Sequence, residues 1–213
     1  MVSRYFVGLD LGQAQDFTAL AVLTRPRLTG RECPADRKPP YAVPHLKRYL
    51  LGTPYPVIVA AVVELLRTPQ LHGSMLVVDQ TGVGRAVVDM LTDAMKGKVS
   101  ATCRPVTITA GHDVTVGENG QYRVPKKELV GCLQELLQSR RLHVARALPE
   151  AAILVRELET FRVKITEAAN ETFGAWREGQ HDDLLLAVAL AAWAGERALP
   201  HEGLAHLPRV IGI

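Results

Sequence analysis

Cysteine is scarce in this chain of 213 residues: the three cysteines, Cys33, Cys103 and Cys132, are odd in number and form no C-x-x-C pair. A disulfide scaffold or a zinc ribbon is therefore not expected, and a reducing cytoplasm is the expected compartment. Aromatic residues make up only 5% of the sequence. Recognition of single strands by base stacking is therefore not indicated.

Long apolar runs are also absent. No run reaches the roughly 18 residues that a membrane-spanning helix needs, and the charged start MVSRYFVGLD does not resemble a secretory signal. A membrane partner is therefore not expected. The chain has no G-x-x-x-x-G-K-[ST] loop, because GVGRAVVD lacks the lysine. We therefore expect no ATPase domain within these residues.

The composition, 47% hydrophobic and 22% charged, is that of a globular protein with a sizeable core. The length predicts one domain spanning residues 1–213. The 25 Lys and Arg residues outnumber the 22 Asp and Glu residues, which gives a formal net charge of +3. This mildly basic balance is compatible with both nucleic acid and small acidic substrates.

The hydrophobic pattern predicts a single α/β domain. We expect strands at 4–11, 17–24, 41–50, 75–79 and 101–109, and helices at 56–67, 84–96, from 125, at 149–158 and at 181–199. Pro44 favours an edge position or a bulge in the third strand. Glu118-Asn119-Gly120 predicts a β-hairpin around 110–124, and a further strand pair is expected around Asn170. Strands separated by helices are expected to be parallel, which gives a mixed sheet.

Four acidic residues stand out by their position. Asp10 lies in the first apolar strand, Asp79 ends the buried strand MLVVD, and Asp182 and Asp183 open the last, mostly apolar helix. A carboxylate in a buried strand is costly unless it is paired or binds a cation. If the strands are neighbours and the last helix crosses the sheet, these oxygens converge into a site suited to Mg²⁺ or Mn²⁺. Two such ions can catalyse phosphodiester hydrolysis.

Each of these acids also has a structural interpretation. Asp10 can face solvent, Asp79 can cap the turn that follows it, and Asp182 can be the N-cap of the last helix. Asp183 can interact with the dipole of that helix. Each structural interpretation is the stronger one for a single residue, whereas the combination of all four favours a metal site.

Three segments resemble the motifs of the nuclease domain of phage terminase large subunits: GLDLGQAQDFTALAVL, VVDQTGVGRAVVDML and GQHDDLLLAVALAAWA. The connecting segments VPKKELVGCLQELLQSRRLHV and ELETFRVKIT are similar as well, so the resemblance covers nearly the whole chain. It implies an RNase H-like (resolvase-like) fold. It also implies a metal-dependent endonuclease that cuts double-stranded DNA during viral DNA packaging.

By this resemblance, Asp10, Asp79 and Asp183 are the catalytic residues and bind two Mg²⁺ or Mn²⁺ ions. Asp182 would be a cap of the helix or a further metal ligand, and Asp16 would either assist the second ion or cap a turn. Asp183 is favoured over Asp182 because residues 187, 191 and 194 on its side of the helix are all alanine, which lets that side approach the sheet.

Cations that hold DNA phosphates are needed in addition. The candidates are Lys126, Lys127, Arg104, Arg162 and Lys164. For each of them a solvated surface charge is the alternative. Little sequence preference is expected, since nothing resembles a recognition helix.

Complete terminases carry an ATPase motor as well, so the chain is expected to be either an excised nuclease domain or a stand-alone relative. The partners implied are double-stranded DNA, the terminase ATPase domain, the portal and the small terminase subunit. The expected location is the host cytoplasm if a phage encodes the chain.

Three other functions are open from the sequence. A Holliday-junction-type resolvase would use the same carboxylates. An actin-like sugar-kinase or chaperone ATPase is suggested by GLDLG, but such proteins need two domains of this kind. A catalytically silent DNA-binding or motor-docking module would use the acids only as caps.

Overall fold

Residues 3–12, 16–26, 38–82, 84–117, 121–165, 171–175 and 182–197 are described by a computed structural model. The strands are β1 (Ser3–Asp10), β2 (Ala19–Pro26), β3 (Tyr41–Arg48), β4 (Met75–Asp79), β5 (Thr102–Thr109), β6 (Thr115–Val116), β7 (Tyr122–Pro125), β8 (Leu142–Val144), β9 (Phe161–Ile165) and β10 (Glu171–Ala175). The helices are α1 (Tyr55–Leu66), α2 (Gly84–Met95), α3 (Lys126–Gln138), α4 (Ala151–Thr160) and α5 (Asp183–Arg197), with a 3-10 turn η2 (Pro69–Leu71).

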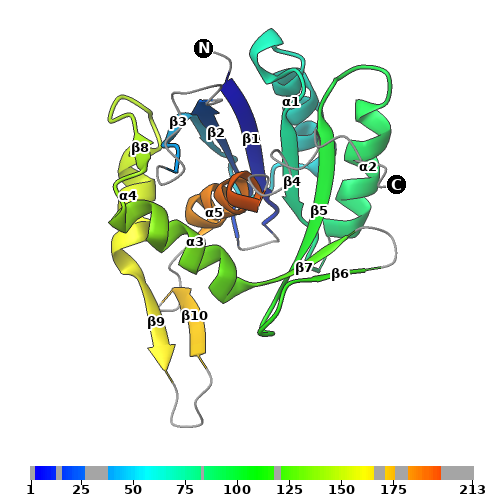
Figure 1. Ribbon diagram of the computed structural model, residues 1–213. Helices are drawn as coiled ribbons and strands as arrows, with labels where there is room; N and C mark the ends of the chain where they lie inside the picture. The colour runs from blue at the N-terminus through cyan, green and yellow to red at the C-terminus, as the bar shows by residue number, and fades with distance from the viewer. Residues whose placement is uncertain are drawn as a thin grey trace, which may run out of the picture.

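Within the described residues, eight strands form one sheet in the order β6-β7-β5-β4-β1-β2-β3-β8 (Figure 1). β1, β2 and β3 are antiparallel neighbours. The pairs β1–β4, β4–β5, β5–β7 and β3–β8 are parallel. The predicted mixed α/β sheet is therefore confirmed. β9 and β10 form a separate antiparallel pair that extends away from the large sheet (Figure 1).

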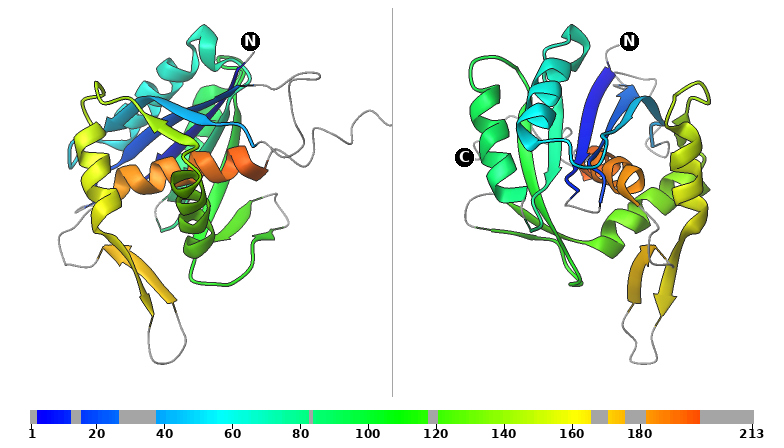
Figure 2. Two further views of the ribbon diagram at one scale, coloured as in Figure 1. Left: turned by 60° about the vertical axis from the view of Figure 1, so that its left-hand side comes forward. Right: turned by 180° about the vertical axis from the view of Figure 1, so that it is seen from behind.

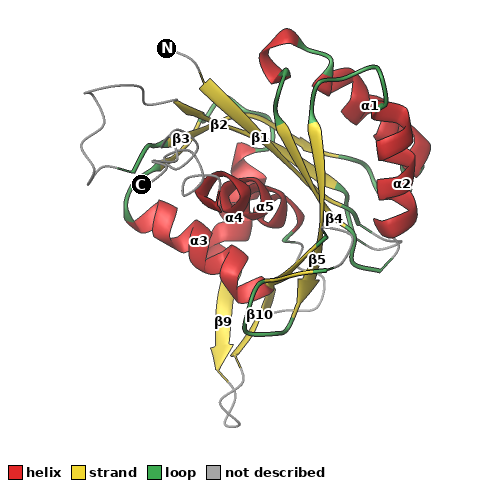
Figure 3. Ribbon diagram, turned by 45° about the vertical axis from the view of Figure 1, so that its right-hand side comes forward, coloured by secondary structure: helices red, strands yellow, loops and turns green. Residues whose placement is uncertain are grey.

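Helices cover both faces of the large sheet. α1 and α2 lie on one face, and α3, α4 and α5 lie on the other (Figures 2 and 3). Because side chains alternate along a strand, β1 contributes to two separate cores. Val7 and Leu9 belong to the core under α1 and α2, whereas Phe6 belongs to the core under α5.

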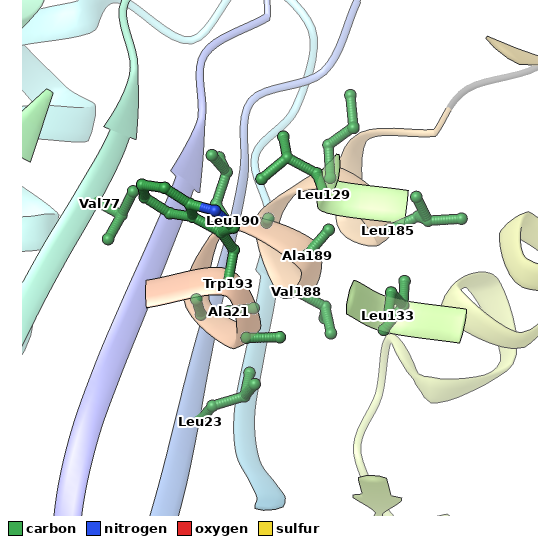
Figure 4. Packing of buried hydrophobic residues seen from close by; sticks show 14 of the residues in the cluster. Ala21, Leu23, Val77, Leu129, Leu133, Leu185, Val188, Ala189, Leu190 and Trp193 are labelled. Carbon is green, nitrogen blue, oxygen red and sulfur yellow. The ribbon is translucent and has the colours of Figure 1, made fainter. Parts of the chain in front are cut away.

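Helix α5 is buried around its whole circumference from Asp183 to Gly195. It lies between the sheet and the helices α3 and α4, so almost no side of it is left for solvent (Figure 3). Figure 4 shows Trp193 beside Val77 of β4, while Leu185 and Val188 point towards α3. This enclosure explains why the sequence of α5 is nearly free of polar residues between its two ends.

The end of α5 that lies farther from Asp183 is fixed by charged groups. Arg25 donates to the carbonyl oxygen of Gly195 over 2.7 Å. The Arg141 guanidinium binds the two carboxylate oxygens of Glu196 over 3.1 and 2.6 Å. The hydroxyl of Tyr41 donates to the same carboxylate over 2.9 Å. These contacts tie the C-terminal end of α5 to β2, β3 and the segment before β8.

The bulge expected at Pro44 is present in β3. Val22 pairs with His45 and Thr24 pairs with Ala42, so two residues of β3 lie opposite one residue of β2. Proline has no N–H to donate, so the missing hydrogen bond disrupts strand pairing least at a bulge. β3 is not an edge strand, because β8 pairs with its other side.

The remaining element predictions differ from the structure mainly at their ends. β2 ends at Pro26, two residues after the predicted end, and the helix predicted at 149–158 spans Ala151–Thr160. Strand β8 was not predicted, because three residues are too short for a periodic pattern. The strand pairs β6–β7 and β9–β10 are present, but the predicted turn residues 118–120 and Asn170 lie outside the described residues. No helix in the described part of the chain is long and apolar enough to span a membrane.

Candidate active site

Asp10 and Asp79 lie at the ends of neighbouring parallel strands. Leu9 of β1 pairs with Val78 of β4, so the two aspartates follow one position later on each strand. Leu9 and Val78 belong to the core under α1 and α2. By alternation, Asp10 and Asp79 therefore share the face that α5 covers.

Asp183 is brought to this place by the close approach of α5 to β1. A Cβ atom on Gly8 would collide with the backbone of Ala187 and lie 3.0 Å from the amide nitrogen of Ala191. Asp10 follows Gly8 by two residues on the same face, and Asp183 precedes Ala187 by one helical turn. The N-terminus of α5 thus lies over the end of β1, and the Asp183 side chain is buried.

The charges of these acids act on one another. Burial raises the pKa of Asp10 well above its ordinary value, and the charges of Asp79, Asp183 and Asp182 raise it further. Lys126 acts in the opposite direction. Burial also raises the pKa of Asp79, while its hydrogen bonds from Thr81 lower it. The structure therefore brings the four predicted carboxylates into one region, where their negative charge is only partly balanced by Lys126 and Arg48. Such a region favours cation binding.

Among the described residues, three of the four carboxylates have hydrogen-bond or ion-pair partners. Oδ1 of Asp79 accepts the N–H and hydroxyl of Thr81 over 2.9 and 2.5 Å. Asp182 binds Nζ of Lys126 over 2.9 Å. Asp183 lies 3.5 Å from Nη2 of Arg48.

The acidic side chains lie near one another, but they do not form a complete set of metal ligands. Among the described residues, no three His, Cys, Asp or Glu side chains form a group that could hold a metal ion. The donor chemistry of clustered carboxylates fits Mg²⁺ or Mn²⁺. Binding would require the carboxylates to turn away from their present partners.

Another acid, Glu157 of α4, is buried and was not predicted. Its Oε2 accepts the N–H of Leu185 over 2.8 Å, so it caps the first turn of α5 from another helix. Burial raises the pKa of Glu157 to about 7, and the neighbouring Asp183 and Asp182 contribute to this shift. One signal was present in the sequence, because Glu157 falls on the buried side of α4 with Ala151 and Leu154.

Arg48 was also missed, since its position depends on strand register. Ala19 of β2 pairs with Asp10 on one side and with Arg48 on the other, so the three residues form a row across the sheet. The guanidinium of Arg48 lies 3.6 Å from the centre of the Phe17 ring. The small side chain of Ala19 leaves room between Asp10 and the guanidinium of Arg48.

Asp16 lies between β1 and β2, close to the start of α1. It is exposed, and it lines a cavity of about 220 Å³ beside the start of α1, together with Thr53, Tyr55 and Ile58. Ile58 belongs to the core on the α1 side of the sheet. The cavity beside Asp16 is therefore on the α1 side of the sheet, whereas α5 covers the opposite face.

The predicted phosphate-binding cations are spread over the molecule. Lys126 lies in the acidic cluster, and Nζ of Lys127 lies 2.6 Å from Nδ1 of His112. The guanidinium of Arg104 lies 4.9 Å from the centre of the Tyr122 ring. Arg162 and Lys164 lie on β9, where only the backbone is described.

The mixed sheet, the antiparallel β1–β2–β3 unit and the buried helix across it form an RNase H-like fold. A scan of the sequence against protein-family models and a search of curated proteins gave no match. Solved structures with the same fold include viral terminase nuclease domains.

The large terminase nuclease from thermophilic phage G20c with bound magnesium matches with 24% identity and a TM-score of 0.59, over 89% of this chain and 80% of that one. The nuclease domain of the large terminase subunit of bacterial virus Sf6 matches with 15% identity and a TM-score of 0.60, over 89% and 87% of the chains. The human cytomegalovirus terminase nuclease domain soaked with manganese matches with 11% identity and a TM-score of 0.55, over 89% and 83%. The resemblance drawn from the motifs is thus confirmed for the fold.

Proposed function

We propose that this chain is a metal-dependent endonuclease that hydrolyses the phosphodiester bonds of double-stranded DNA, the genome-cutting activity of a viral packaging terminase. The observation that carries the proposal is the convergence of acids from β1, β4 and α5 around the buried Asp10. The fold supports it, since the similar domains from phage G20c, Sf6 and cytomegalovirus are described as terminase nucleases.

In this proposal Asp10, Asp79 and Asp183 hold two divalent ions, with Asp182 as a further ligand and Asp16 a more distant candidate. When bound, Mg²⁺ or Mn²⁺ would activate water for attack on phosphorus and stabilise charge on the leaving oxygen. The protein would orient the site through β1, β4 and α5, which pack against one another. The G20c and cytomegalovirus structures, with bound magnesium and after a manganese soak, support the choice of ions.

Lys126 would balance the negative charge at Asp182 and approach the DNA backbone there. Lys127, Arg104, Arg162 and Lys164 are proposed to contact phosphates farther from the cut, without reading sequence. We propose residues 1–213 as one nuclease domain in which 110–124 is a hairpin insertion. It would act in the host cytoplasm with a terminase ATPase motor, a portal and a small terminase subunit.

A plasmid assay tests this function. Supercoiled DNA is incubated with the protein in Mg²⁺, Mn²⁺ or EDTA, and the products are separated on agarose. We expect nicking and linearisation with either ion and none in EDTA. Asp10→Asn and Asp183→Asn should reduce the rate by at least about a hundredfold.

Asp93→Asn is the matched control, because Asp93 is an exposed carboxylate on α2, which covers the opposite face of the sheet. It should cleave like the native protein. Cleavage that continues in EDTA, or that survives Asp10→Asn, would show that the acidic cluster is not the active site.

A further inference from the structure

Two basic side chains from different elements face the acids at the start of α5. Lys126, the first residue of α3, pairs with Asp182 over 2.9 Å. Arg48, the last residue of β3, approaches Asp183 to 3.5 Å. The acidic cluster therefore has a positive group on two sides.

Arg48 is held firmly in this place. Its guanidinium stacks on Phe17 at 3.6 Å, and its side chain is only 17% exposed. Its buried Nε has no hydrogen-bond partner among the described residues. Stacking on Phe17 and the pairing of β3 with β2 thus hold the guanidinium beside Asp183.

We propose that Arg48 is a positioning residue for Asp183: it fixes this carboxylate when no metal is bound and competes with divalent cations for it. The inference rests on the proposed nuclease function, because it assumes that Asp183 is a metal ligand. Asp10, Asp79, Asp182 and Glu157 add negative charge around the same point. Without a positive group beside it, Asp183 would be repelled from the cluster.

Two effects with opposite signs follow for a variant that lacks this charge. The acids become more negative in total, so a divalent cation binds more tightly. The Asp183 carboxylate also loses its fixed orientation, so cleavage slows even when metal is saturating. If Arg48 only stabilised the fold, its replacement would not strengthen metal binding.

The experiment measures Mn²⁺ binding to the full chain by calorimetry in the absence of DNA, and plasmid cleavage at saturating Mn²⁺. Arg48→Gln should bind Mn²⁺ about five- to tenfold more tightly and cleave about tenfold more slowly. Arg48→Lys keeps the charge and should bind Mn²⁺ within about twofold of the native protein. Arg67→Gln is the matched control, since Arg67 pairs with Glu64 on the exposed side of α1.

Arg48→Met serves if Arg48→Gln does not fold, because it keeps an unbranched stem against Phe17 and removes only the charge. Mn²⁺ affinity in the charge-removing variant that is equal to or weaker than the native value overturns the proposal. That includes the case in which neither protein binds Mn²⁺. Weaker DNA binding in EDTA at unchanged Mn²⁺ affinity also overturns it, and identifies Arg48 as a phosphate contact instead.

Failure of the proposed function gives a different result. In that case no protein cleaves DNA, yet the difference in Mn²⁺ affinity between Arg48→Gln and the native protein persists. The two claims are therefore tested separately by one set of proteins.

Discussion

Gly8 of β1 lies directly against the backbone of Ala187 in α5, with no space for a Cβ atom between them. This contact sets how closely the helix approaches the central strand. Because Asp10 and Asp183 extend from the same two elements near this point, the approach also sets the distance between the two acids. The contact therefore links the packing of the core to the geometry of the proposed site.

Gly8→Ala should destabilise the protein by about 3 kcal/mol, since either α5 or β1 must move to make room. Urea denaturation followed by circular dichroism measures this change. Gly131→Ala is the control, because a Cβ at this exposed position of α3 meets no other atom. It should stabilise the protein by roughly 0.5 kcal/mol through helix propensity. Equal stability of Gly8→Ala and the native protein would mean that the helix is not so close to β1.

Glu157 makes stability depend on pH. Its pKa is raised from 4.5 to about 7 in the folded protein, so the folded state binds the proton more tightly than the unfolded state does. Stability from this group is complete below about pH 4.5 and is lost as the pH rises through about 7. Glu157→Gln should therefore be more stable than the native protein at pH 8, by about 2 kcal/mol after allowance for solvent, and equal to it near pH 4.5.

Thermal unfolding of both proteins without metal, at several pH values, measures this difference. Glu159→Gln is a suitable control on the same helix, because Glu159 is exposed. A constant difference between Glu157→Gln and the native protein across the pH range would argue against a raised pKa at Glu157.

Lys126 and Lys127 are adjacent in sequence but should have different functions. Lys126 pairs with Asp182, whereas Lys127 lies against His112 at the surface. Lys126→Met should slow cleavage at saturating DNA by about tenfold, because a charge beside the reacting phosphate is lost. Lys127→Met should mainly weaken DNA binding and reduce its salt dependence. Equal effects of the two substitutions on cleavage would contradict this distinction.

The C-terminal end of α5 allows the stability of the fold to be changed without a change at the proposed metal site. Arg141→Met leaves the partly buried Glu196 carboxylate without its bidentate partner and should cost about 3 kcal/mol. Mn²⁺ affinity should stay unchanged, since the two ends of α5 are separated by the length of the helix. Arg67→Met, at an exposed pair, should cost less than about 0.5 kcal/mol. A large change in Mn²⁺ affinity with Arg141→Met would show that the site is coupled to this anchor.

The sequence predicted those parts of the molecule that depend on local pattern. Asp79 at the end of MLVVD was recognisable because the strand is a continuous apolar run with an acid only at its last position. The alanines at 187 and 191 predicted that α5 comes close to the sheet, and Gly8 meets both of them. The place of Asp10 beside Asp79 then followed from fold resemblance.

Residues that depend on tertiary register were not predictable in this way. Arg48 reaches Asp183 only because Ala19 aligns it with Asp10 across β2, and no spacing in the sequence encodes that alignment. Glu157 reaches the start of α5 because α4 packs beside it. The positions of both residues therefore depend on how the strands and helices pack together.

Diffraction data collected at the manganese absorption edge, from crystals soaked in Mn²⁺, address the main claim most directly. We expect anomalous peaks between the ends of β1 and β4 and the start of α5, in contact with oxygen atoms of Asp10 and Asp183. Fully occupied manganese elsewhere, with this region empty and the two carboxylates still apart, would refute the assignment of these acids as the metal site.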